Sequence, residues 1–236
     1  MHVQDLALVR GMDHTRATLA DWNVAPGEVL CRWLLLSAAV AVLLLLGVWL
    51  VASLATADPT PQYLIGLTSA PTGADVAHVL TRNALVLALH AFACVAGYLA
   101  GSQLPREAQR RSGVWRRVHD LAGPLAITFV TLATLFSLTT QGYILGNQAA
   151  SLSAQLGVAP GVFIFGLLPH ALLELTALFL PLAAWLLASR RGAWHELFAA
   201  TLVTTAIAIP TLVVASLIEV YLSPRLMGSL ASYYTF

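Results

Sequence analysis

Residues 162–188 read VFIFGLLPHALLELTALFLPLAAWLLA, and this stretch decides the class of the fold. Its apolar run is longer than the roughly 20 residues that a helix needs to cross a hydrocarbon core about 30 Å thick. Only His170 and Glu174 within it can ionise. The stretch therefore predicts a transmembrane helix that carries an ionisable pair inside the membrane.

Four further apolar runs predict a bundle of five transmembrane helices. They lie at residues 33–54, 83–104, 121–145 and 197–222. The composition agrees, since 58% of the residues are hydrophobic, only 10% are charged and the mean hydropathy is +0.80. Several prolines and glycines between residues 56 and 75 predict a loop rather than a sixth helix. We therefore expect an all-α, polytopic membrane helix bundle without a soluble domain.

The chain divides into three expected segments. Residues 1–28 mix apolar and charged side chains, which predicts a short amphipathic helix at the cytoplasmic face. Whether this helix lies on the membrane surface, or packs under the bundle or against a partner, stays open. Residues 29–224 form the transmembrane domain, and residues 225–236 form an outer C-terminal tail.

Arginine predicts the orientation in a cell membrane. The chain has no lysine, and most of its arginines lie before the first span or in the second and fourth connections. These are Arg10, Arg16, Arg32, Arg106, Arg110, Arg111, Arg116, Arg117, Arg190 and Arg191. By the positive-inside rule the N-terminus is cytoplasmic and the C-terminus lies outside, with only Arg82 and Arg225 on the outer side. We interpret the basic connection as a topology determinant and expect no nucleic-acid partner.

The two cysteines predict neither a disulfide nor a sulfur-bound cofactor. Cys31 lies at the cytoplasmic end of the first predicted helix, whereas Cys94 lies well inside the second. Cysteines at such different depths offer no zinc-binding spacing and no redox pair. We expect no cofactor.

Polar residues inside the predicted helices gather in the outer half of the membrane. The expected cluster consists of Asn83, His90, Gln141, His170, Glu174 and Glu219. Ionisable groups in a bilayer are costly and normally face a protein interior or a watery cavity. His170 and Glu174 are four residues apart and therefore share one helix face. We expect both to face the bundle interior and to approach His90 and Glu219.

Two prolines predict breaks in the helices that carry this cluster. Pro169 directly precedes His170, and Pro210 lies near the centre of the last predicted helix. Each proline removes a backbone donor and frees a carbonyl group. A break at Pro169 would aim the imidazole and a freed carbonyl into one interior space, while a kink that only shapes packing is the alternative.

Paired glycines predict close helix packing. Gly97 and Gly101 form one G-x-x-x-G motif, and Gly142 and Gly146 form another. The packing partner could be a helix of this chain or of a second copy.

The run LPHALLELTA at residues 168–177 resembles the Pro-His-Gly-x-x-Glu-x-x-Ala signature of the stage II sporulation protein M family. Three other helices agree in order. The matching residues are Asn83 with Gly97 and Gly101, Gln141 and Gly142 with Gly146, and Pro210 with Ala215, Glu219 and Pro224. The resemblance covers residues 33–224, although Ala171 replaces a glycine of the family and Gln141 replaces an asparagine.

This resemblance implies a membrane architecture and a set of polar positions, with little chemistry. The founding members work beside a peptidoglycan hydrolase and a protease-like partner in spore engulfment, and other relatives accompany the biosynthesis of circular bacteriocins. Beside the lipid bilayer, we therefore expect a membrane or periplasmic protein partner, and a second copy of the chain is a further candidate.

Three functional hypotheses remain open. The leading one is an integral membrane scaffold or assembly subunit of a larger membrane complex. The second is a transport or export component, in which His90, His170, Glu174 and Glu219 line a proton-titrating vestibule. The third is an intramembrane peptidase or peptide cyclase with His170 and Glu174 as catalytic candidates. In that hypothesis the two residues act as acid and base or bind a metal together with His90 and Glu219.

Overall fold

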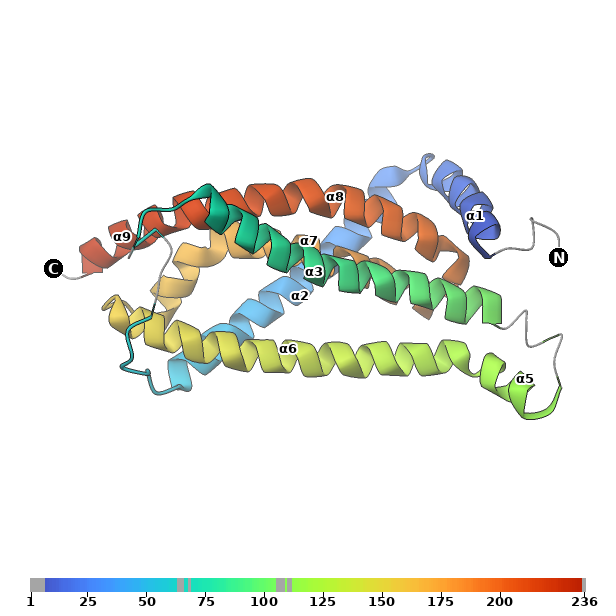
Figure 1. Ribbon diagram of the computed structural model, residues 1–236, viewed down its shortest axis with the longest axis horizontal. Helices are drawn as coiled ribbons and strands as arrows, with labels where there is room; N and C mark the ends of the chain where they lie inside the picture. Colours follow the sequence, from blue (N-terminus) through green and yellow to red (C-terminus); the bar gives the residue numbers. More distant parts are fainter. Residues whose placement is uncertain (1–6, 63–65, 68, 105–108, 110–111, 235–236) are drawn as a thin grey trace. The chain divides into compact units, whose positions relative to one another are not determined.

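A computed structural model describes residues 7–62, 66–67, 69–104, 109 and 112–234 of the chain (Figure 1). The regular structure in these ranges is helical, as predicted. The α-helices are α1 (Ala7–Trp22), α2 (Pro26–Leu54), α3 (Gly73–Tyr98), α5 (Gly113–Asp120), α6 (Ala122–Gln155), α7 (Pro160–Arg190), α8 (Leu197–Leu217) and α9 (Ser223–Tyr234). Two π-helical segments, η2 (Leu99–Gln103) and η4 (Ile218–Leu222), and the 3-10 helix η3 (Trp194–Glu196) extend or join them.

Five helical stretches are long and apolar enough to cross a membrane, which confirms the predicted bundle. They are Pro26–Leu54, Gly73–Ser102, Pro124–Gln155, Pro160–Arg190 and Trp194–Tyr233. Each exceeds the roughly 20 residues that the hydrocarbon core requires, so the helix ends reach into the headgroup region or beyond. The chain is a multi-pass membrane protein.

The helices form two compact units, and most of the long helices contribute to both. The first unit contains the described parts of Met1–Ser37, Val86–Thr134 and Leu178–Ala208. The second contains those of Ala38–Leu85, Leu135–Ala177 and Ile209–Phe236.

In the first unit, α1 packs against other helices. The ring centroid of His14 lies 6.2 Å from that of Tyr98 and 6.0 Å from that of His195. A Cβ atom added at Gly11 would lie 3.6 Å from both the Tyr98 hydroxyl and the Phe198 ring. In the first unit α1 therefore contacts α3, η3 and α8. The first six residues of the predicted segment lie outside the described ranges.

A glycine turn joins α7 to η3 and α8. Gly192 has φ +68°, a left-handed conformation that suits glycine because it has no Cβ atom. The Ala193 N–H donates to the Ala188 carbonyl at 2.9 Å, and the Gly192 N–H donates to the Ser189 carbonyl at 3.1 Å. This is the Schellman arrangement, which satisfies the last carbonyls of a helix.

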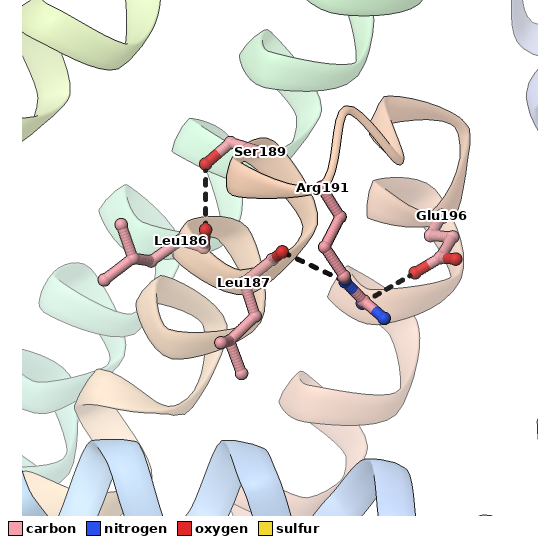
Figure 2. A network of polar contacts seen from close by, with 5 residues as sticks. All are labelled: Leu186, Leu187, Ser189, Arg191 and Glu196. Atoms are coloured by element: carbon pink, nitrogen blue, oxygen red, sulfur yellow. Dashed lines mark hydrogen bonds and ion pairs between the residues drawn. The ribbon is translucent and has the colours of Figure 1, made fainter.

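Polar side chains reinforce the same turn (Figure 2). Arg191 Nη2 lies 3.2 Å from Glu196 Oε2, and Arg191 Nε donates to the Leu187 carbonyl at 3.1 Å. Ser189 Oγ donates to the Leu186 carbonyl. Arg191 thereby neutralises the carbonyl-rich end of α7 and holds the start of the next helix.

The structure shows no interruption of the helix at Pro169 or at Pro210, where breaks were expected. α7 continues through Pro169 and α8 continues through Pro210 without interruption of the helix. Transmembrane helices tolerate proline because neighbouring helices and small local adjustments can satisfy the freed backbone groups.

The expected C-terminal tail is helical over most of its length. α9 runs from Ser223 to Tyr234, and only residues 235–236 lie outside the described ranges. Met227 of this helix is 4% exposed, and its sulfur lies against Gly166 of α7. This packing continues the last span well beyond the apolar run that predicted it.

The glycine motifs lie at close helix contacts inside each unit. In the first unit, Gly97 faces the Trp185 ring and Gly101 faces the Trp194 ring. In the second unit, a Cβ atom added at Gly146 would lie 2.5 Å from the Val51 Cβ atom. α6 therefore approaches α2 closely because glycine leaves room there.

Candidate functional site

A layer of polar side chains lies within the second unit, and we call it the polar layer. Its members are Arg82 and Asn83 of α3, His170 and Glu174 of α7, Glu219 of η4 and Ser223 at the start of α9. Counted along their helices at 1.5 Å per residue, these positions lie roughly 15–20 Å from the nearer helix end. This depth is inside the hydrocarbon region for helices of such length.

His170 and Ser223 form the best-defined contact of the polar layer. His170 Nδ1 lies 2.6 Å from Ser223 Oγ. His170 is 8% exposed and Ser223 is 4% exposed, so the hydrogen bond is buried. It connects the middle of α7 with the start of α9.

Glu174 has three polar neighbours in the polar layer. The Arg82 guanidinium, the Asn83 amide and the Glu219 carboxyl group all interact with it. Arg82 also acts on Glu219, so one cation faces two carboxyl groups. The electrostatic attraction lowers the cost of placing these carboxyl groups in a membrane.

Two buried atoms of the polar layer lack a hydrogen-bond partner within the described part of the chain. They are Asn83 Nδ2 and Glu219 Oε2. Asn83 is only 2% exposed, and its amide lies beside Glu174 without a hydrogen bond of standard geometry from Nδ2. Because buried polar groups are nearly always bonded to protein or water, this part of the polar layer has spare hydrogen-bonding capacity.

A π-helical turn carries Glu219 and ends at Ser223. The Ser223 N–H donates to the Ile218 carbonyl, five residues earlier, instead of to the usual residue four earlier. Pro224 follows and has no N–H to continue the regular pattern. Gly66 of the α2–α3 loop, with φ +79°, lies against the Pro224 ring. π-turns often mark functional or strained positions in helices.

Two residues of the predicted cluster lie elsewhere. His90 belongs to the first unit, where its Nδ1 lies 2.7 Å from the Leu178 carbonyl oxygen. Gln141 is exposed on α6, and its Nε2 donates to Ser137 Oγ of the same helix at 2.9 Å. The polar layer therefore contains Asn83, His170, Glu174 and Glu219 of the predicted set.

Sequence reasoning did not include Arg82 and Ser223 in the cluster. Arg82 was interpreted only as a topology signal, although it directly precedes Asn83 in a predicted span. Ser223 fell at the end of the last predicted helix, where no apolar pattern indicated that the helix continues. The one signal for Ser223 in the sequence is His170, because a buried histidine requires a hydrogen-bond partner.

The metal-binding candidates do not form a ligand set. Across the described ranges, no group of three or more His, Cys, Asp or Glu side chains is positioned to hold a metal ion. Both thiols are free: Cys31 is exposed, and buried Cys94 donates to the Pro181 carbonyl at 3.2 Å.

The α2–α3 loop is attached to the end of α6 in the second unit. The Asp58 N–H donates to Ser151 Oγ at 2.9 Å, and the Gln62 N–H donates to Gln155 Oε1 at 2.9 Å. Gln155 Nε2 donates back to the Gln62 carbonyl at 3.2 Å. The Asp58 carboxylate accepts a hydrogen bond from the Thr60 N–H, which lowers the pKa of Asp58 below its ordinary value.

The fold and the polar layer define a multi-pass α-helical membrane protein with buried ionisable side chains. The family described as stage II sporulation protein M matches residues 37–224. Because this match covers well over half of the 236 residues, the chain belongs to the stage II sporulation protein M family. Comparisons with curated proteins and with solved structures found no match.

Proposed function

We propose that the chain is an integral membrane scaffold, an assembly subunit of a larger membrane complex, and that its polar layer is structural. The observation that carries this proposal is the buried hydrogen bond of 2.6 Å between His170 and Ser223. The bond occupies Nδ1 of the imidazole. A histidine used in this way holds two helices together.

The charged members of the polar layer support the same role. Glu174 and Glu219 face Arg82 from different helices, so their charges are partly balanced inside the unit. This attraction favours one register of α3, α7 and η4, because sliding would separate opposite charges. We expect the partner to be a membrane or periplasmic protein.

The proposal includes the orientation of the chain. The arginine distribution supports a cytoplasmic α1 and an α9 at the outer face. Single cysteines at Arg16 and Ser229, introduced after Cys31→Ser, would test this with a membrane-impermeant maleimide added to intact cells. Labelling of the Ser229 position alone is expected, whereas labelling of the Arg16 position alone would reverse the orientation.

The assembly role is testable in native membranes. The full chain would be extracted into polymer-bounded nanodiscs, and the mass of the particle would be compared with the 25.1 kDa of the chain. We expect a discrete complex with another protein at fixed stoichiometry. We also expect a Glu219→Gln variant to retain both the complex and the ability to complement a deletion strain. Loss of complementation with the complex and the protein level unchanged would contradict a structural role.

A second candidate is a transport component, and the unpartnered atoms Asn83 Nδ2 and Glu219 Oε2 favour it. Unused hydrogen-bonding capacity beside two carboxyl groups suits the passage of water or protons. The chain reconstituted in vesicles containing a pH-sensitive dye would test this role. Proton flux that is lost in Glu219→Gln would replace the scaffold proposal.

A further inference from the structure

α6 is the least covered of the membrane-spanning helices. Only 6% of its apolar 18-residue stretch is buried, compared with 22–50% of the corresponding stretches in the other four spans. Exposure to lipid is ordinary for apolar side chains. The polar side chains on this helix therefore need a separate explanation.

One side of α6 packs against α2 through glycine. A Cβ atom added at Gly142 would lie 3.7 Å from Leu44, and one at Gly146 would lie 2.5 Å from Val51. With about 100° of rotation per residue, Gln141 points roughly 100–140° away from these glycines. Gln141 is accordingly exposed.

Gln141 lies close to the middle of the membrane-spanning stretch of α6. It is within two residues of the centre of Pro124–Gln155, which corresponds to about 3 Å along the helix. Its Nε2 donates to Ser137 Oγ of its own helix. Among the described residues, no other helix bonds to its amide, so Oε1 and the second N–H are unused. Acyl chains cannot bond to them, and an unsatisfied polar group in lipid is costly.

Three polar side chains and one isoleucine form a regular stripe on this helix. Ser137, Gln141, Ile144 and Gln148 are exposed and follow one another at spacings of four, three and four residues. This is the spacing of the a and d positions along a left-handed helix pair, the commonest packing in membrane bundles. Polar residues at such positions fix register and the number of chains. We call this surface the glutamine stripe.

We propose that the glutamine stripe binds the same stripe of a second copy of this chain. Two copies inserted in the same orientation are related by a two-fold axis perpendicular to the membrane, so equivalent residues meet at equal depth. A glutamine amide is self-complementary, because each copy offers a donor and an acceptor. Gln141 of one copy therefore bonds to Gln141 of the other at the same depth, and the two Gln148 side chains bond to each other nearer the helix end.

This inference deepens the proposed assembly role, on which it rests, by naming the partner of one surface. The test uses the purified chain alone. A chain that is monomeric in vesicles yet part of a fixed complex in native membranes would overturn the inference and leave the proposed function standing.

The first experiment counts copies of the full chain, labelled at exposed Cys31, in phosphatidylcholine–phosphatidylglycerol vesicles by single-molecule photobleaching. Two-step bleaching should increase with protein density. Gln141→Leu should lower the association constant about 10-fold, since such bonds contribute about 1–2 kcal/mol in membranes. The matched control is Thr139→Leu, which changes an exposed residue at nearly the same depth whose hydroxyl bonds to the Leu135 carbonyl of its own helix. The control should leave association unchanged.

A second experiment does not depend on how Gln141→Leu folds. One exposed cysteine, at Gln148 or at Thr139, would be introduced after Cys31→Ser, with buried Cys94 left in place, and the vesicles would be treated with a mild oxidant. The Gln148 position should form disulfide-linked dimers and the Thr139 position should not. Single-step bleaching at every density, equal cross-linking at both positions, or association only when another protein is added would each overturn the proposal.

Discussion

His170 Nδ1 on α7 and Ser223 Oγ at the start of α9 are 2.6 Å apart, although 53 positions separate the two residues in the chain. Both side chains are buried. The hydrogen bond therefore ties together two helices that are not consecutive in the chain. It is the contact on which the structural interpretation of the polar layer depends.

We expect His170→Ala and Ser223→Ala each to lower the free energy of unfolding by about 1–3 kcal/mol, because each leaves a buried polar group without a partner. The double variant should lower the free energy of unfolding by about 0.5–1.5 kcal/mol less than the sum of the two single variants. Unfolding in mixed micelles with increasing dodecyl sulfate would measure these values. Ser216→Ala is the control, since this buried hydroxyl bonds to the Leu212 carbonyl of its own helix. A coupling energy of zero would show that the contact does not hold the helices together.

A charge-balance prediction concerns Arg82 and Glu219. Arg82→Gln should destabilise the protein by about 1 kcal/mol or less, because the guanidinium of Arg82 attracts both carboxyl groups but is itself exposed. Adding Glu219→Gln should recover part of this loss, since one carboxyl group remains. The same unfolding assay checks this, with Arg225→Gln as the control, since Arg225 is an exposed residue of α9. If the loss of unfolding free energy in the double variant equals the sum of the losses in the two single variants, Arg82 and Glu219 do not interact.

The two glycines of α6 make a matched pair for testing helix approach. Gly146→Ala should cost about 1–3 kcal/mol, because its Cβ atom would collide with Val51 at 2.5 Å. Gly142→Ala should be neutral or stabilising, since its Cβ atom would make an ordinary contact with Leu44 at 3.7 Å and alanine favours helix. Thermal unfolding of both variants in the same nanodiscs measures the difference. Equal effects would contradict the close approach of α2 and α6.

The α2–α3 loop should respond to pH through Asp58. The Thr60 N–H stabilises the charged carboxylate, so the pKa of Asp58 lies below its ordinary value of about 3.9. A lowered pKa means that the stabilisation is present above pH 3.9 and is lost as the pH falls through the lowered pKa. The amide proton shift of Thr60, followed by NMR, should therefore titrate with a midpoint below 3.9. Asp58→Asn should abolish this titration, and a midpoint above 4 would refute the contact.

The five spans and most of the polar layer were predictable because length and solvation decide them. An apolar run of the right length has few alternatives to a membrane helix. The cost of charge in lipid explains why Glu174 and Glu219 were expected to face partners. The hydrogen bond to Ser223 could not be predicted, since Ser223 follows the last apolar run and its position depends on the π-turn at the end of that run.

Other differences follow from contacts that one sequence does not reveal. Pro169 and Pro210 remain inside helices because tertiary surroundings can offset the lost backbone bonds. Gln141 was placed in the polar cluster because an amide in a membrane was expected to face the interior. Its exposure depends on which face of α6 the glycines occupy. That face follows from packing against α2, which periodicity alone does not determine.

The attachment of the α2–α3 loop to α6 imposes an order on biosynthesis. Asp58 and Gln62 each bond to a residue made 93 positions later. At about 5–20 residues per second, the ribosome needs roughly 5–20 seconds to supply those partners. During that interval these two hydrogen bonds cannot form, so the loop between α2 and α3 is bonded to α6 only after the end of α6 has been made.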